Sequence, residues 1–128
     1  MWVFLSDAFF SIVEVKDRPE SLLVRARFPD DIPRVFDCVG AKVQHTPDAD
    51  YAYRAVIARD TVAFVISSEV NRIDYTNFKN SVTDEWRAHA YLNVWAHMAS
   101  AQDQAVRRGR RSLGRARKPT PPAGPGQV

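Results

Sequence analysis

The sequence predicts an α+β fold in which helices pack on one face of an antiparallel or mixed sheet. Residues 9–15 are rich in aromatic and β-branched side chains, and residues 21–28 alternate apolar and polar side chains, as strands do. Residues 60–73 instead carry apolar side chains at helical spacing. The 128 residues are 45% hydrophobic, which suffices for one core. The expected order is β-β-β-α-β-β-α-α, and a ferredoxin-like variant is its nearest common architecture.

Three strands are expected before the first helix. Residues 2–6 and 9–15 form the first two around a tight turn at residues 7–8. A loop at residues 16–20, which contains a proline, leads to the third strand at residues 21–28. That strand divides its side chains between two faces: Leu22, Val24, Ala26 and Phe28 on one, Arg25 and Arg27 on the other.

A short helix is expected to follow Pro29. Asp30 or Asp31 is placed to cap its N-terminus, and Gly40 is a suitable C-terminal stop. Their spacing places four apolar residues on one face of this helix: Ile32, Val35, Phe36 and Val39.

The second half of the chain is expected to contain two strands and two helices. Residues 41–45 and 51–58 are strands. Residues 60–73 have high β-propensity, but the long helical pattern outweighs it. After a loop at residues 74–82, a long helix runs to about residue 106. Its apolar stripe, expected to be buried, consists of Ala88, Tyr91, Leu92, Trp95, Met98 and Ala99.

Charge is distributed unevenly along the chain. Residues 107–118 contain seven basic residues and no acidic ones. Residues 1–106 hold 11 basic residues against all 15 acidic ones, a net charge of −4. We therefore expect a single domain over residues 1–106 and a disordered basic tail, rich in proline and glycine toward its end, over residues 107–128.

The basic tail is the main candidate for nucleic-acid binding. Its cations would contact phosphates without reading sequence, because the tail has no aromatic residue to stack on bases. Its glycine and serine spacing argues against a long amphipathic helix on a membrane. The predicted contact residues are Arg107, Arg108, Arg110, Arg111, Arg115, Arg117 and Lys118.

The loop at residues 74–80 is the candidate site for a protein partner. It combines two aromatic side chains with amides and a lysine, a mixture found at recognition surfaces. The alternative is that the aromatic rings anchor the loop to the core. The candidate contacts are Tyr75, Asn77, Phe78 and Lys79.

A second loop contains His45, Asp48 and Asp50, followed by Tyr51 and Tyr53. Two carboxylates beside a histidine could bind a cation or act as an acid–base pair. The stronger alternative is turn geometry, since the oxygen ligands of an EF-hand are missing. The sequence predicts no metal site and no catalytic residue.

Other residues suggest no chemistry. Glu85 and His89 have a spacing that could hold a metal with a third ligand, and His97 lies further round the same helix. An ion pair on a solvated flank is the favoured interpretation. Cys38 is expected to be a buried structural thiol. The phosphate-binding glycine motifs are missing, so no cofactor is expected.

Two features of the sequence predict where in the cell the protein is found. A single cysteine excludes an intramolecular disulfide and favours the cytoplasm. No run of 18 apolar residues is present, so no membrane-spanning helix and no membrane partner are expected.

Four segments of the chain resemble a family of small bacterial, plasmid and phage α+β proteins. These segments are MWVFLSDAFFSIV, DRPESLLVRAR, HTPDADYAYR and IDYTNFKNSV. The resemblance covers about residues 1–98 and leaves out the basic tail. It implies a shape and no activity, cofactor or partner.

Three functional hypotheses follow. The first is a small non-enzymatic binding protein whose body engages a protein partner while its tail adds non-specific nucleic-acid affinity. The second is an inhibitor or accessory protein of a phage or mobile element, such as an anti-defence protein. The third is a small metal- or ligand-binding enzyme that uses the loop at residues 45–51.

Overall fold

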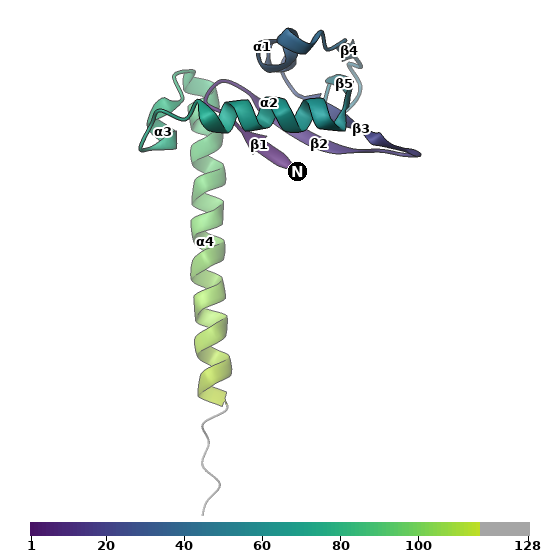
Figure 1. The fold of residues 1–128 in the computed structure, drawn as a ribbon. Coiled ribbons are helices and arrows are strands. Elements are labelled where there is room, and N and C mark those ends of the chain that lie inside the picture. Colours follow the sequence, from purple (N-terminus) through teal and green to yellow (C-terminus); the bar gives the residue numbers. More distant parts are fainter. Residues whose placement is uncertain (116–128) are drawn as a thin grey trace, which may run out of the picture. The chain divides into compact units, whose positions relative to one another are not determined.

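The computed structural model describes the backbone of residues 1–115 and the side chains of residues 1–111. The chain divides into two units, of which the first is Met1–Ala88 and the second begins at His89. The first unit contains a sheet with short helices, which confirms the α+β class (Figure 1). The described part of the second unit is helical. Residues 116–128, which the sequence predicts to be disordered, lie outside the described residues.

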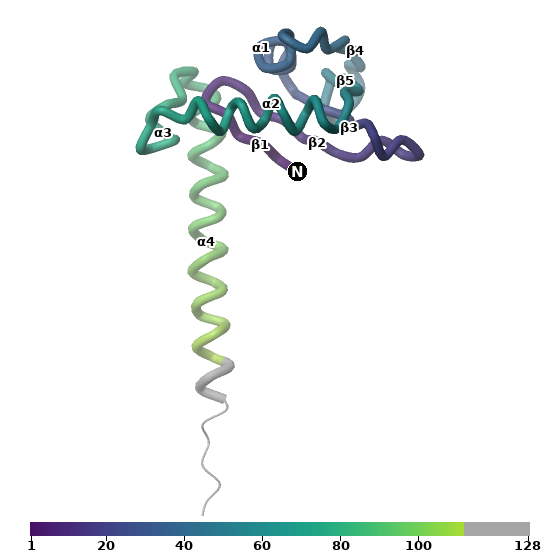
Figure 2. Tube along the Cα trace, in the orientation of Figure 1, coloured from purple at the N-terminus to yellow at the C-terminus, as the bar shows by residue number. Residues whose placement is uncertain are grey.

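The sheet has five strands in the order β1-β2-β3-β5-β4, and each neighbouring pair is antiparallel. The antiparallel alternative is therefore confirmed. The segment β3-α1-β4-β5-α2 matches the first five elements of the ferredoxin-like order β-α-β-β-α-β, and no strand follows α2 among the described residues. The strands are β1 (Trp2–Phe4), β2 (Phe9–Val15), β3 (Arg18–Ala26), β4 (Gln44–His45) and β5 (Tyr53–Ala58), and Figure 2 follows them along the chain.

The connection between β2 and β3 is shorter than the predicted loop at residues 16–20. Val15 pairs with Arg18, so only Lys16 and Asp17 form the turn. Asp17 has a φ of 61°, in the left-handed region that hairpin turns often use. Aspartate adopts it more readily than most residues, which allows the strand to begin before Pro19.

One face of the sheet carries the core. Its buried side chains are Phe10, Ile12, Val24, Ala26, Ala55 and Ile57. Helix α1 (Asp31–Phe36) and helix α2 (Arg59–Asn71) cover this face. The rings of Phe10 and Phe36 meet edge to face, with centroids 5.4 Å apart. Helices packed on one face of the sheet are therefore confirmed.

Helix α1 ends as predicted but begins differently. A 3-10 turn, η1 (Asp37–Val39), leads to Gly40, whose φ of 65° is the left-handed stop expected of a glycine. Asp30 occupies the N-cap position, yet its side chain makes no capping bond. The Asp31 carboxylate instead accepts a hydrogen bond from the Phe9 backbone N–H at 3.1 Å. The prediction of an aspartate cap is therefore wrong.

Helix α2 confirms the helical interpretation of residues 60–73. Val62 and Val65 are buried in the core, and Ile66 packs against it. The predicted apolar face does not stay buried to its end, because Val70 and Ile73 are exposed. The first two turns of α2 therefore provide its packing.

Two helices follow α2. The predicted loop at residues 74–82 contains the short helix α3 (Phe78–Ser81), which the sequence analysis missed. Helix α4 (Glu85–Arg115) has 31 residues and continues past the predicted end near residue 106. Residues 107–115, expected to be disordered, are helical. Arginine is a good helix former, and cations near a C-terminus interact favourably with the helix dipole, which together offset the cost of Gly109.

Candidate nucleic-acid interface

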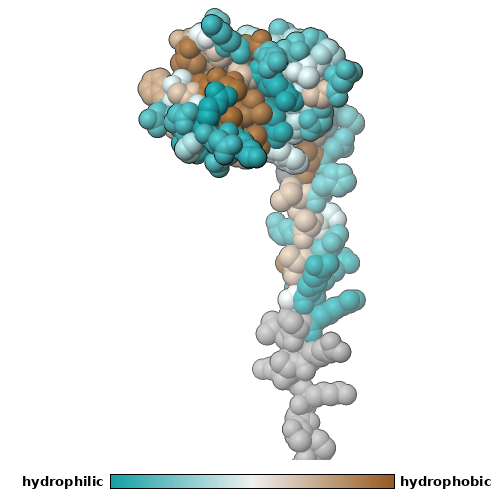
Figure 3. Space-filling model, turned by 90° about the vertical axis from the view of Figure 1, so that its right-hand side faces the viewer, coloured by the Kyte–Doolittle hydropathy of each residue, from teal (hydrophilic) through white to brown (hydrophobic). Residues whose placement is uncertain are grey.

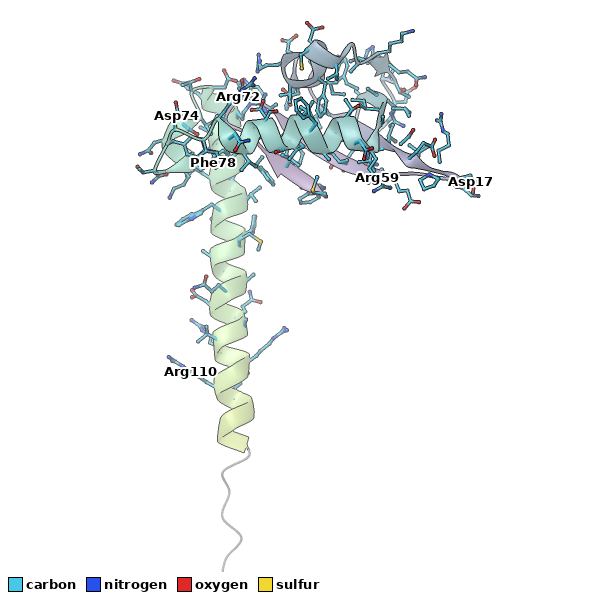
Figure 4. All side chains as sticks on the ribbon, viewed as in Figure 1. Asp17, Arg59, Arg72, Asp74, Phe78 and Arg110 are labelled. Carbon is cyan, nitrogen blue, oxygen red and sulfur yellow. The ribbon has the colours of Figure 1, made fainter. Side chains whose placement is uncertain are left out.

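The described end of α4 carries four exposed arginines, Arg107, Arg108, Arg110 and Arg111. At 100° per residue, the four lie within an arc of about 160° on one side of the helix. Figure 4 shows Arg110 extending away from the helix. Gln104 and three of the arginines, Arg107, Arg108 and Arg111, line a shallow depression of about 250 Å³. We call the four arginines the arginine face.

The arginine face is not neutralised within the described part of the chain. None of its four guanidinium groups forms an ion pair with a described carboxylate, although Asp103 precedes Arg107 by one helical turn. Each guanidinium offers five N–H donors in a planar fork that matches phosphate oxygens. Arg115 is the last residue described, while Arg117 and Lys118 lie outside the described residues. Four of the seven predicted contacts therefore lie side by side on one helix.

The apolar stripe of α4 is mostly exposed, which corrects the prediction that it is core. Trp95 is 56% exposed and Met98 is 66% exposed, and Leu92 is also accessible. The core is instead made by the sheet, α1 and α2. Figure 3 shows hydrophobic residues along one side of this helix and hydrophilic residues along the other. The helix is therefore amphipathic along its exposed length.

The argument from glycine and serine spacing against a long amphipathic helix is also wrong. Gly109, Ser112 and Gly114 all fall inside α4. Single glycines cost about 1 kcal/mol each, which a long helix tolerates. No helix in the described part of the chain is long and apolar enough to cross a membrane.

The predicted partner-binding loop is partly buried. Asn77 caps α3 by accepting a hydrogen bond from the Lys79 backbone N–H at 3.0 Å. The rings of Tyr75 and Phe78 lie 5.8 Å apart, and both are half-buried. The two rings contact each other, but neither belongs to the hydrophobic core cluster, so the choice between a partner site and a core anchor stays open.

Two adjoining depressions border the same loop. The first, of about 270 Å³, includes Leu5, Glu69, Arg72 and Tyr75 in its lining. The second, of about 290 Å³, is lined by residues 74–77, Asn80 and Ser81. Asp74, Tyr75 and Ser81 border both. Of the predicted contact residues, Tyr75 and Asn77 line these depressions, whereas Phe78 and Lys79 do not.

The polar groups of the loop at residues 45–51 stabilise its turn. One Asp50 carboxylate oxygen accepts a hydrogen bond from the Tyr51 backbone N–H at 2.9 Å, and the Asp50 carbonyl accepts one from Arg27 at 2.7 Å. His45 stacks flat on Tyr53, with ring centroids 4.7 Å apart. No group of three or more His, Cys, Asp or Glu side chains among the described residues could hold a metal ion.

Cys38 is exposed, so the prediction of a buried thiol is wrong. The buried positions of α1 end at Phe36, and the change to a 3-10 turn takes Cys38 off that face. Its thiol lies 3.9 Å from the Val35 carbonyl.

A buried ion pair within the first unit was missed by the sequence analysis. Arg87 donates to Asp31 at 2.7 Å, and the two side chains are only 2% and 1% exposed. The partners are 56 residues apart, so no local pattern predicts the contact. Arg87 also lies against the Trp86 ring, at 4.6 Å from its centroid, and Trp86 stacks on Phe28. The pair ties the start of α4 to the start of α1.

Comparison with known proteins gives no relative. The chain matches no protein-family model, no curated protein and no solved structure. The resemblance to small bacterial, plasmid and phage proteins therefore stays a prediction, and the case for function depends on the arrangement of the residues themselves.

Proposed function

We propose that this chain is a small nucleic-acid-binding protein that holds phosphate groups with the arginine face of α4. The observation that carries the proposal is the grouping of four exposed arginines on one side of a helix, with no carboxylate partner among the described residues. Such a surface attracts any polyanion, and each phosphate contact releases counterions. The binding is therefore independent of sequence and sensitive to salt.

Helical geometry supports this role. A rise of 1.5 Å per residue places Arg107 and Arg111 about 6 Å apart along the helix axis. Arg108 and Arg110 flank them on either side, so the positive charge forms a compact patch. Arginine forks bind phosphate oxygens in pairs, which gives each contact a defined geometry.

The test compares two quadruple variants on duplex DNA at low salt. Replacing Arg107, Arg108, Arg110 and Arg111 with alanine should weaken binding at least tenfold. Replacing the same four residues with lysine keeps the charge and should retain most of the affinity, since the contacts are largely electrostatic. Equal binding by the wild type and the alanine variant would refute the proposal.

A second candidate function, engagement of a protein partner by the first unit, is supported by the two depressions around residues 74–81. The test is photocrosslinking from a photoreactive amino acid that replaces Asn77, which is exposed at the rim of the second depression. A control probe at Glu20 sits on an exposed part of β3. A crosslink to one protein from Asn77 but not from Glu20 supports this function; the same products from both positions, or none, refute it.

A further inference from the structure

The face of the sheet opposite the core carries a row of neighbouring side chains. Register places Trp2 opposite Ser11, Ser11 opposite Arg25, and Arg25 opposite Arg54. Gln44 continues the row on β4, opposite Arg54. The core residues Phe10, Ile12, Val24 and Ala55 occupy alternate positions on the same strands, so this row lies on the opposite face, where Ser11 is itself only 2% exposed.

Three arginines gather in this region without a carboxylate partner. Arg25 donates to the Ser11 hydroxyl at 2.7 Å, Arg27 to the Asp50 carbonyl at 2.7 Å, and Arg54 to the Tyr51 carbonyl at 3.2 Å. All three acceptors are neutral oxygens. No ion pair to these arginines forms within the described residues. The Nε atoms of Arg25 and Arg54 are buried and have no hydrogen-bond partner in that part of the chain.

This arrangement is costly for folding alone. Like charges directly opposite each other on neighbouring strands are destabilising, and Arg25 and Arg54 are such a pair. The Tyr51 ring offsets part of the cost, because it lies 4.7 Å from the Arg25 guanidinium and 4.3 Å from that of Arg27. The three hydrogen bonds above occupy only three of the fifteen N–H donors that these groups offer to acceptors within the described residues. An anion would satisfy them and neutralise the cluster.

An exposed aromatic ring lies in the same row. Trp2 is 65% exposed and touches Phe9 edge to face, with centroids 6.2 Å apart. Neighbouring strands are about 4.8 Å apart, so the backbones of Trp2 and Arg25 are separated by about 10 Å. A stacking ring beside unpaired arginines is the combination that holds single-stranded nucleic acid, with bases on the ring and phosphates on the cations. A duplex keeps its bases stacked on each other and cannot use the ring.

We propose that this outer sheet face binds single-stranded nucleic acid, with phosphate at Arg25, Arg27 and Arg54 and a base stacked on Trp2. The inference rests on the proposed function for the class of ligand. It adds a second site and a preference for single strands, which the arginine face of α4 does not provide.

The test measures fluorescence anisotropy with a labelled oligothymidylate of about 12 nucleotides, a length within the range of single-strand sites. A mixed-sequence duplex of the same length is the second ligand. The variants are Trp2→Ala and the double variant R25Q/R54Q. Arg18→Gln is the matched control, because it removes one exposed charge from the far end of β3.

We expect Trp2→Ala to weaken single-strand binding about five- to hundredfold, the range found for removal of a stacking ring, and duplex binding less than twofold. The double variant should weaken single-strand binding at least tenfold, and Arg18→Gln should change it less than twofold. Melting curves check that each variant folds. Should the double variant fail to fold, Trp2→Ala decides the question, because its ring is exposed.

Three results would overturn the inference. One is single-strand binding by both variants as tight as that of the wild type. Another is equal loss of duplex and single-strand affinity in Trp2→Ala. The third is competition by polyglutamate as effective as competition by unlabelled oligonucleotide, which would assign the cluster to an acidic protein instead. If duplex binding still depends on the arginine face in these cases, the proposed function stands. Absence of binding to either nucleic acid would end both proposals.

Discussion

The first unit and the exposed length of α4 use their apolar residues differently. In the first unit, Phe10 and Phe36 are fully buried between the sheet and α1. Along α4, Trp95 and Met98 are more than half exposed, although their spacing is as regular as any in the chain. A regular apolar stripe therefore identifies a helix without showing that the stripe is buried. Whether such a stripe is buried depends on which other elements pack against it.

A large loss of stability is expected from breaking the buried ion pair of the first unit. Arg87→Met leaves the Asp31 carboxylate buried without its partner, which typically costs about 3–5 kcal/mol. Replacing both residues, as Arg87→Met with Asp31→Leu, should recover part of that loss, because Asp31→Leu also removes the acceptor of the Phe9 backbone N–H. Urea unfolding of the two variants measures both values. A loss below about 1 kcal/mol for the single variant would mean that the pair is solvated.

Two aromatic truncations compare the units directly. Phe36→Ala removes a fully buried ring and should destabilise the protein by about 3–5 kcal/mol. Trp95→Ala removes a ring that is 56% exposed and should cost about 1 kcal/mol or less. Thermal melting distinguishes them clearly. Equal destabilisation by both would show that the stripe of α4 is part of a core.

A smaller effect is expected at the exposed ion pair of the first unit. Arg34 and Asp7 approach to 4.0 Å with side chains 40% and 57% exposed. Asp7→Ala should change the free energy of unfolding by less than about 1 kcal/mol, because solvent screens such pairs. The value is compared with that of Arg87→Met under the same conditions. A loss as large as that of Arg87→Met would mean that exposure does not separate the two pairs.

Removal of residues 107–128 should affect melting least. The described side chains in this segment, those of residues 107–111, are all exposed. A protein that ends at residue 106 should melt within a few degrees of the full chain, as the predicted boundary requires. A drop of more than about 10 °C would show that these residues stabilise the fold.

Local patterns were enough to predict most elements of the fold. Alternation in residues 21–28 placed Arg25 and Arg27 opposite the core, and the helical spacing in residues 60–73 outweighed a strong β-propensity. The short helix α3 escaped because four residues cannot show a helical period. The extension of α4 escaped because the change in charge and composition after residue 106 predicts a disordered tail, although arginines favour the helix.

Of the candidate sites, too, some could be predicted from the sequence and others could not. Composition was enough to identify the arginines of α4, because all four fall within residues 107–111. Strand register brings Arg25 opposite Arg54, and tertiary packing brings Asp31 to Arg87. Neither pairing follows from spacing along the chain, since each joins segments that are far apart. The sequence could thus identify a linear charge cluster but not a cluster assembled by the sheet.

The most direct test of the central claim is the salt dependence of binding to duplex DNA. With about five to seven phosphates neutralised, the slope of log K against log salt should be roughly −4 to −6 for the wild type. Replacing the four arginines of the arginine face with alanine should make the slope less negative by about 3 to 4, with the melting temperature unchanged. The same slope and affinity for both proteins would contradict the claim that α4 holds the phosphates.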